Sequence, residues 1–129
     1  MTDTLTIAEA ADQLGLTPDT LRYYERDGLL VVAVGRSASG HRRYSPNDLR
    51  WVLLVTQLRG TGMSIRDVRR YADLVRDGSG NETERLDLLK EHRRKVLARL
   101  AEVQQHLGAI DHKIGNYTDA LAGQDVGAA

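Results

Sequence analysis

The sequence predicts a mainly α-helical fold, in which a small domain of four short helices and one β-hairpin precedes a single long helix. Three observations support this fold class. Helix-start signals, a Ser or Thr followed by Pro or an acidic residue, recur through the first half of the chain. A β-branched apolar run ends in a glycine-bounded turn at residues 35–40. Residues 86–121 repeat apolar side chains at alternating steps of three and four, which is typical of a coiled coil.

The composition excludes several classes of protein. The 129 residues carry 18 basic and 18 acidic side chains, so the net charge gives no indication of nucleic-acid or membrane binding. The absence of cysteine excludes disulfides, thiolate metal sites and iron–sulfur clusters. Neither a signal-peptide pattern nor an apolar stretch of about 18 residues occurs. We therefore expect a soluble, cytoplasmic protein without a membrane partner.

Residues 6–28 carry the signature of two short helices joined by a tight turn. Thr6 and Glu9 form a capping box, in which each side chain satisfies a backbone amide of the other residue. Gly15 ends the first helix, and Thr17, followed by proline, begins the second. A helix, a glycine turn and a second helix with polar outer residues make a helix-turn-helix, although an ordinary helical hairpin would share these features.

The second of these helices has the composition of a recognition helix. Leu21 and Tyr24 lie on one face, which leaves Thr20, Arg22 and Tyr23 on the others. Arg22 can form a bidentate contact with a phosphate or a guanine edge, and Tyr23 can donate a hydrogen bond to a phosphate. This helix is therefore the predicted reader of double-stranded DNA.

Residues 29–44 are predicted to form a basic β-hairpin, the wing. Residues 29–34 suit a strand, residues 35–40 a turn and residues 41–44 the returning strand. No acidic residue occurs in residues 28–47. The arginines of this stretch, which can hold phosphates, are Arg36, Arg42 and Arg43. Beside the helix-turn-helix, they favour a winged helix-turn-helix over a merely solvated hairpin.

A second helical pair follows at residues 45–77 and completes the predicted DNA-binding domain of residues 1–77. Ser45 and Ser64 are the predicted caps of its two helices. The residues expected to be buried are Leu49, Val52 and Leu53 in the first helix and Ile65, Val68, Ala72 and Val75 in the second. This pair should pack under the helix-turn-helix.

Residues 78–83 form the predicted linker to a long helix over residues 84–121, and residues 122–129 are expected to be disordered. The chain offers this helix no partner of comparable length, so an isolated copy would expose its apolar stripe. We therefore predict a homodimer. Arg93 is the one polar interruption, and the dimerisation residues are Leu86, Leu89, Val96, Leu100, Val103, Leu107, Ile110, Ile114 and Tyr117.

In order and spacing, these motifs resemble those of MerR-family transcription regulators. The matching segments are residues 5–11, 17–26, 28–30, 42–45 and 48–49. The resemblance implies a two-fold dimer joined by antiparallel helices and bound to a pseudo-palindromic promoter operator. It further implies that the bound regulator bends and untwists an over-long spacer, so that RNA polymerase can engage both promoter elements.

The resemblance also implies which residues contact DNA. The matching residues are Thr17, Thr20, Arg22, Tyr23 and Tyr24 in the recognition helix and Arg42, Arg43 and Tyr44 in the wing, to which the charge pattern adds Arg36. The spacing of Tyr24 from Leu21 fits a core residue equally well. Both interpretations of Tyr24 stay open at this point.

The chain departs from the family pattern in what it could sense. Family members that sense metals or redox state use cysteines, and this sequence has none. It also ends soon after the long helix, without the family's large drug-binding domain. It therefore resembles a short member, in which a small-molecule effector sits between the dimer helix and the other subunit's DNA-binding half, or in which no effector acts. A coiled-coil interaction protein or an architectural DNA-binding protein is the alternative function.

No catalytic residue, metal site or cofactor is predicted. The carboxylates are isolated charges or cap partners, which argues against an enzyme. Glu102 and His106 have the i,i+4 spacing of residues on one helix face. One carboxylate and one imidazole make a weak metal site, however, and a surface pair is the simpler interpretation.

Overall fold

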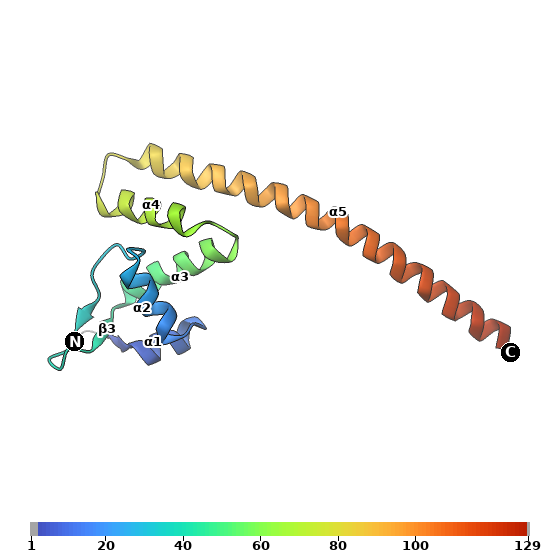
Figure 1. Ribbon diagram of the computed structural model, residues 1–129, viewed down its shortest axis with the longest axis horizontal. Coiled ribbons are helices and arrows are strands. Elements are labelled where there is room, and N and C mark those ends of the chain that lie inside the picture. The colour runs from blue at the N-terminus through green and yellow to red at the C-terminus, as the bar shows by residue number, and fades with distance from the viewer. Residues whose placement is uncertain (1–2, 129) are drawn as a thin grey trace. The chain divides into compact units, whose positions relative to one another are not determined.

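The described part of the chain contains eight helices and strands, which fall into two units. The structure, a computed structural model, describes residues 3–128 and the side chains of residues 3–124. Contacts divide the chain into units of residues 1–90 and 91–129. The elements (Figure 1) are β1 (Leu5–Thr6), α1 (Ile7–Leu14), α2 (Pro18–Arg26), β2 (Gly35–Arg36), β3 (Arg42–Tyr44), α3 (Pro46–Gly60), α4 (Ile65–Arg76) and α5 (Glu82–Ala128).

The predicted caps begin the first four helices. At α1, the amide of Thr6 donates to the Glu9 carboxylate at 2.9 Å, and the amide of Glu9 donates to the Thr6 hydroxyl at 3.1 Å. Ser45 caps α3 through the same kind of capping box. The Thr17 and Ser64 side chains accept amide hydrogen bonds at the starts of α2 and α4. These bonds satisfy amides that have no partner inside the helix, so short-range chemistry fixes where each helix starts.

Two glycines end the helices of the predicted helix-turn-helix. Gly15 has a φ of 70°, and Gly28 has a φ of 74°, a left-handed conformation that strains any residue with a Cβ. The amide of Leu16 then donates to the carbonyl of Ala11 at 2.8 Å, and the amide of Leu29 donates to the carbonyl of Tyr24 at 3.0 Å. Both helices therefore stop where the sequence indicates.

The wing belongs to a three-stranded antiparallel sheet of order β1-β3-β2. Leu5 lies opposite Tyr44, and Gly35 lies opposite Arg43. The short strand β1 was not predicted. The predicted strand over residues 29–34 is wrong, because β2 contains only Gly35 and Arg36.

Residues 29–34 have no strand partner, and side chains donate hydrogen bonds to backbone carbonyls of this segment. The indole Nε1 of Trp51 donates to the carbonyl of Leu29 at 2.7 Å. Nη2 of Arg76 donates to the carbonyls of Leu30 at 2.6 Å and Gly28 at 3.1 Å. Leu29 and Val34 are buried in the core. The apolar run therefore anchors a loop to the core. It resembles a strand in composition only.

One hydrophobic core joins α1–α4 and the sheet. Its buried residues are Ala10, Ala11, Leu21, Tyr24, Leu29, Val34, Tyr44, Val52, Val55, Met63 and Val68. On α3, Val52 and Val55 face the core. Leu53 is therefore directed outward and is 44% exposed. The expectation that Leu53 is buried was wrong for this reason. Trp51 and Tyr71 extend the core by stacking at 5.7 Å between ring centroids.

The first turns of α5 belong to the N-terminal unit. The helix begins at Glu82, two residues earlier than predicted, and Leu88 and Leu89 pack against the core. Nδ2 of Asn81 donates to the carbonyl of Leu74 at 2.8 Å, which ties the start of α5 to α4. Leu89 therefore packs, partly buried, against the core of its own unit, and its assignment to the dimerisation stripe stays a prediction.

The remainder of α5 continues as a helix through Ala128. Disorder was expected over residues 122–129, but residues 122–128 are helical, and Ala129 lies outside the described residues. Alanine favours a helix, and the two glycines of this segment, Gly123 and Gly127, cost about 1 kcal/mol each at most. Among the described residues, no helix combines the length and the apolar character needed to cross a membrane.

Replacing Tyr44 by Phe should make the fold less sensitive to alkaline pH. The side chain is buried, and its hydroxyl has no hydrogen-bond partner among the described residues. Burial, followed by the charge of Glu25, raises the pKa of Tyr44. Its contribution to stability is therefore present below about pH 10 and is lost as the pH rises through the folded-state pKa.

We expect Tyr44→Phe to change the free energy of unfolding at pH 7 by less than about 1 kcal/mol. Between pH 9 and pH 11 the variant should lose less stability than the parent protein. Urea unfolding followed by the fluorescence of Trp51, the single tryptophan, measures both. Equal losses for Tyr44→Phe and the parent would contradict this account.

Candidate nucleic-acid interface

The outer face of α2 presents most of the predicted helix contacts. Thr17 and Arg22 are exposed, and Thr20 and Tyr23 are partly exposed. Nη1 of Arg22 lies 2.8 Å from the carboxylate of Asp19 on the same helix. An exposed pair of this kind is weak, so a phosphate or a base can replace the carboxylate. These positions are compatible with DNA contact, and the contacts themselves stay predictions.

Two tyrosines predicted to contact DNA are core residues. Tyr24 is 6% exposed and Tyr44 is fully buried. Tyr24 packs on the inner face of α2 with Leu21, which decides between its two interpretations. Side chains alternate along a strand, so Tyr44 is directed into the core while its neighbour Arg43 is directed to the other face. Neither ring is available to DNA in this structure, and both assignments are corrected.

Two wing arginines meet one carboxylate from the recognition helix. Nη2 of Arg36 lies 3.0 Å from Oε1 of Glu25, and Nε of Arg42 lies 2.5 Å from Oε2. Glu25 is not among the residues that the sequence predicts for this site, because it lies on α2, just outside the acid-free stretch that defined the wing. The positions of these two wing arginines therefore depend on a residue outside the wing.

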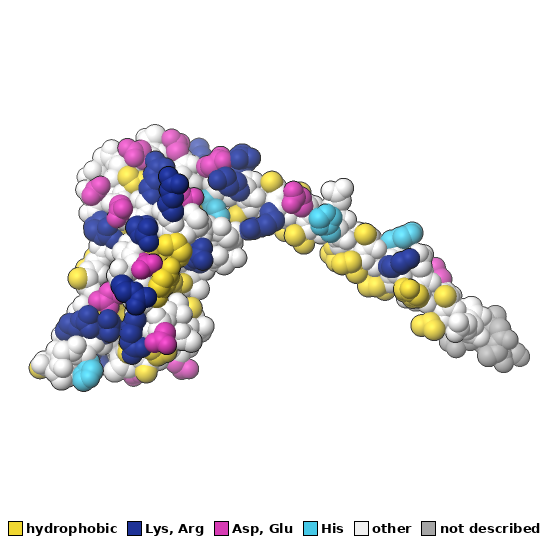
Figure 2. Space-filling model, in the orientation of Figure 1, with side chains coloured by type: hydrophobic (Ala, Val, Ile, Leu, Met, Phe, Trp, Pro, Cys, Tyr) yellow, Lys and Arg dark blue, Asp and Glu magenta, His cyan; other side chains and the backbone are white. Residues whose placement is uncertain are grey.

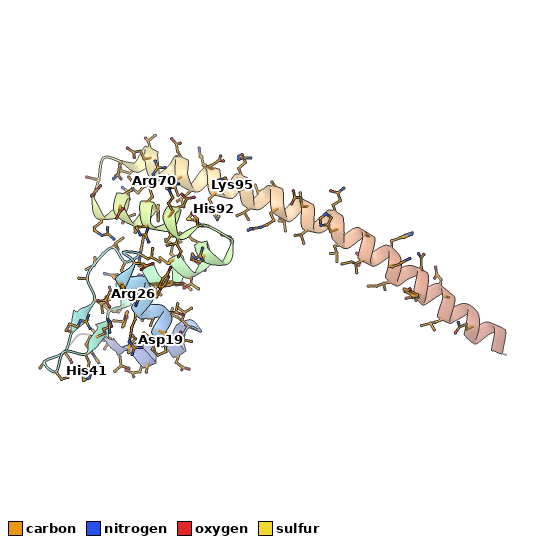
Figure 3. All side chains as sticks on the ribbon, in the orientation of Figure 1. Asp19, Arg26, His41, Arg70, His92 and Lys95 are labelled. Carbon is orange, nitrogen blue, oxygen red and sulfur yellow. The ribbon has the colours of Figure 1, made fainter. Side chains whose placement is uncertain are left out.

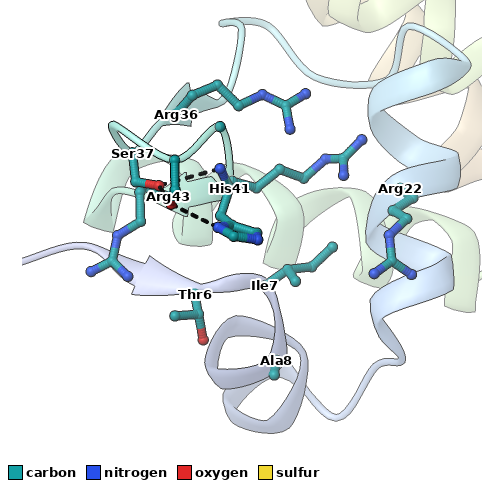
Figure 4. Close-up of a pocket in the computed structure, with 11 residues that line it drawn as sticks. Thr6, Ile7, Ala8, Arg22, Arg36, Ser37, His41 and Arg43 are labelled. Carbon is teal, nitrogen blue, oxygen red and sulfur yellow. Dashed lines mark hydrogen bonds between the residues drawn. The ribbon is translucent and has the colours of Figure 1, made fainter.

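The third wing arginine, Arg43, holds the N-terminal segment. Its Nε donates to the hydroxyl of Thr4 at 3.0 Å, and its Nη2 donates to the carbonyl of Thr4 at 2.9 Å. Figure 4 shows Arg43 directed to the side of β1, away from Arg36, which reaches toward α2. The three arginines thus have different environments, although the sequence presents them as equivalent.

A groove lies between α1, α2 and the wing (Figure 4). It has a volume of about 550 Å³ and is lined by Thr6, Ile7, Ala8, Arg22, Arg36, Ser37, Ser39, Gly40, His41, Arg42 and Arg43. At the wing turn, Ser39 Oγ lies 2.8 Å from His41 Nδ1, and the amide of Ser37 donates to the carbonyl of His41 at 2.8 Å. These bonds order the turn that carries His41 (Figure 3).

The C-terminal end of α2 is fixed by charged groups. The Arg26 guanidinium lies 5.8 Å from the centre of the Tyr23 ring. A hydrogen bond to Asp27, with burial as a smaller cause, raises the pKa of Tyr23. The Tyr23 hydroxyl therefore donates to Asp27, and a phosphate would have to replace that carboxylate as the acceptor. Nε of Arg69, from α4, donates to the carbonyl of Asp27 at 2.8 Å and so satisfies the end of the helix.

Metal ligands do not gather anywhere in the part of the chain that the structure describes. No group of three His, Asp or Glu side chains there could hold a metal ion. Glu102 and His106 are both exposed on α5. Figure 2 shows Lys and Arg side chains over the N-terminal unit, with Asp and Glu side chains among them.

The fold and this surface define a class of protein. A helix-turn-helix whose second helix exposes Arg22 and Tyr23, next to a hairpin that carries arginines, is a winged helix-turn-helix DNA-binding module. The chain belongs to the MerR family of transcription regulators. The model of the "MerR HTH family regulatory protein" family matches residues 5–74, and that of the "MerR, DNA binding" family matches residues 49–118.

Relatives of similar length support this assignment. An HTH-type transcriptional regulator of Haemophilus influenzae is 37% identical over 92% of this chain and 87% of its own length. The crystal structure of HiNmlR, described as a MerR family regulator lacking the sensor domain and bound to promoter DNA, superposes with a TM-score of 0.83. The two sequences are 37% identical, and the superposition covers 92% of this chain and 94% of the HiNmlR chain.

A putative MerR family regulator from Listeria monocytogenes also has a TM-score of 0.83, at 36% identity over 97% of this chain and 99% of its own. The protein is therefore a MerR-type DNA-binding transcription regulator, and its family consists of regulators and not of enzymes. The expected fold class, a winged helix-turn-helix followed by a long helix, is confirmed.

Replacing Arg22 by Ala should weaken specific DNA binding more than non-specific binding. Loss of a bidentate base contact costs about 1–3 kcal/mol, which corresponds to roughly 5- to 150-fold in affinity. Fluorescence anisotropy would compare a duplex selected from a random pool by the parent protein with a random duplex of equal length. Arg94→Ala, on the exposed surface of α5, is the control. An unchanged ratio of the two affinities in Arg22→Ala would remove Arg22 from base recognition.

Proposed function

We propose that this regulator binds a pseudo-palindromic promoter operator as a homodimer and controls transcription by bending and untwisting the DNA between the two polymerase elements. In this proposal RNA polymerase is an indirect partner, which responds to the shape of the promoter. The cytoplasm, where a bacterial chromosome lies, is the expected place of action. The observation that carries the proposal is the exposed apolar stripe of α5.

The stripe consists of large apolar side chains that are between 49% and 66% exposed in the single chain. Its members are Leu100, Val103, Leu107, Ile110, Ile114 and Tyr117, and Figure 2 shows hydrophobic side chains along one edge of the helix. Their spacing follows the alternating three and four steps of a coiled-coil seam. A surface of this kind favours a second copy of the same helix, because such a copy offers a matching stripe of equal length.

A two-fold dimer explains why the operator should be a dyad. Each subunit contributes one α2 and one wing, so the two half-sites must repeat with the symmetry of the protein. Contacts on both flanks can stabilise a deformed central spacer that the protein does not touch. HiNmlR, which matches this chain over most of its length, was crystallised on promoter DNA, and this supports a promoter as the target.

Genome-wide capture of the bound DNA, followed by footprinting of the strongest site, tests the operator. We expect protection of a dyad that lies between the two polymerase elements of a longer than usual spacer, with enhanced cleavage at its centre. Dispersed binding without a dyad would contradict the proposal and favour an architectural role. Adding candidate metabolites to the footprint would distinguish a regulator that responds to an effector from one that does not.

Replacing Leu107 by Asp should dissociate the dimer. A charge in the middle of the stripe would lie unpaired in a dry seam, which is costly. Analytical ultracentrifugation at micromolar concentration should show monomers, and operator affinity should fall by about 10²-fold or more, because the second half-site no longer binds as part of one molecule. Gln105→Asp, at an exposed position outside the stripe, is the matched control. A Leu107→Asp variant that remains dimeric would exclude this stripe as the interface.

A further inference from the structure

We propose that Glu25 sets the selectivity of DNA binding by restraining Arg36 and Arg42, so that the wing binds arbitrary phosphates weakly. The inference rests on DNA binding by the N-terminal unit and does not require the dimeric operator or the untwisting of the spacer. Its failure would therefore leave the proposed function intact.

The two arginines lie directly opposite each other in the sheet. The pairing of β2 with β3 places Arg36 across from Arg42, on the same face of the hairpin. Like charges at directly opposed positions destabilise an antiparallel pair. A carboxylate between them removes this repulsion, and Glu25 is the residue that supplies it.

Glu25 uses both of its oxygens for this purpose. Oε1 lies 3.0 Å from Nη2 of Arg36, and Oε2 lies 2.5 Å from Nε of Arg42. The Glu25 side chain is 23% exposed, so the three charges interact in partly excluded solvent, where attraction is stronger than on an open surface. One carboxylate from the recognition helix therefore orients both strands of the wing relative to α2.

The same geometry weakens long-range attraction to DNA. A free arginine adds to the non-specific affinity by releasing counterions from the phosphates. An arginine that shares a carboxylate adds less, because a phosphate must first compete with the carboxylate. In a specific complex, the recognition helix lies fully in the groove and holds the phosphates at a fixed place beside the wing. In a non-specific complex, the phosphates have no such fixed place. Glu25 thus lowers the non-specific affinity more than the specific one.

Glu25→Gln tests the proposal, since it keeps the size of the side chain and removes its charge. The variant should bind a random 30-base-pair duplex more tightly than the parent, by about 3- to 10-fold. The salt dependence of log K should become steeper by about 1 to 2 units, because each newly engaged phosphate adds about 0.9. The ratio of affinities for a duplex selected by the parent protein and for the random duplex should fall at least 3-fold.

Asp12→Asn is the matched control, because it makes the same change in net charge on the exposed surface of α1, outside the wing. Its salt dependence should equal that of the parent. The double variant Glu25→Gln, Arg36→Gln should return the non-specific affinity toward the parent value. Thermal unfolding followed by circular dichroism shows that each variant is folded.

If Glu25→Gln does not fold, Glu25→Asp serves in its place, because the shorter side chain keeps the charge but cannot reach both arginines. It should then raise non-specific affinity by a smaller factor. The proposal is overturned if a folded Glu25 variant binds the random duplex with the parent's affinity and salt dependence. It is also overturned if affinities for both duplexes fall equally, since Glu25 would then serve only the stability of the wing.

Discussion

The rest of the N-terminal unit depends on how firmly α2 is held. Its inner face buries Leu21 and Tyr24, and the Thr17 side chain caps its first turn. Beyond its last turn, Arg69 and Arg76 of α4 donate to the carbonyls of the chain that leaves the helix. A helix fixed at both ends and along one face presents its outer residues in one orientation, and recognition of base edges requires this.

Some arginines of this protein bind groups within the protein, and others are only weakly paired. The net charge of the chain does not distinguish the two kinds. Arg43 and Arg76 satisfy backbone carbonyls at the N-terminal segment and at the start of the wing. Arg36 and Arg42 share the carboxylate of Glu25. Arg22 pairs only weakly, with an exposed aspartate on its own helix. The arginine count of the wing therefore overstates the number of its guanidinium groups that are free of partners within the protein.

The long helix α5 combines a role in the fold with an exposed apolar surface. Leu88 and Leu89 complete the core of the N-terminal unit, whereas the side chains of the stripe from Leu100 onward are exposed in the single chain. The heptad pattern runs through both segments without a change. Hydrophobic periodicity identifies an apolar face, but it does not say whether that face packs on its own domain or on a second molecule.

The sequence by itself determined where the first four helices begin, how the helix-turn-helix ends and that a long apolar stripe follows. These features depend on caps, glycines and periodicity, which act over three or four residues. Only the tertiary structure decided that residues 29–34 form a loop, that Leu53 is exposed and that Tyr44 is buried. It alone brought Glu25 to Arg36 and Arg42. These outcomes depend on partners distant in sequence, such as Trp51 and Arg76, and local patterns contain no information about such partners.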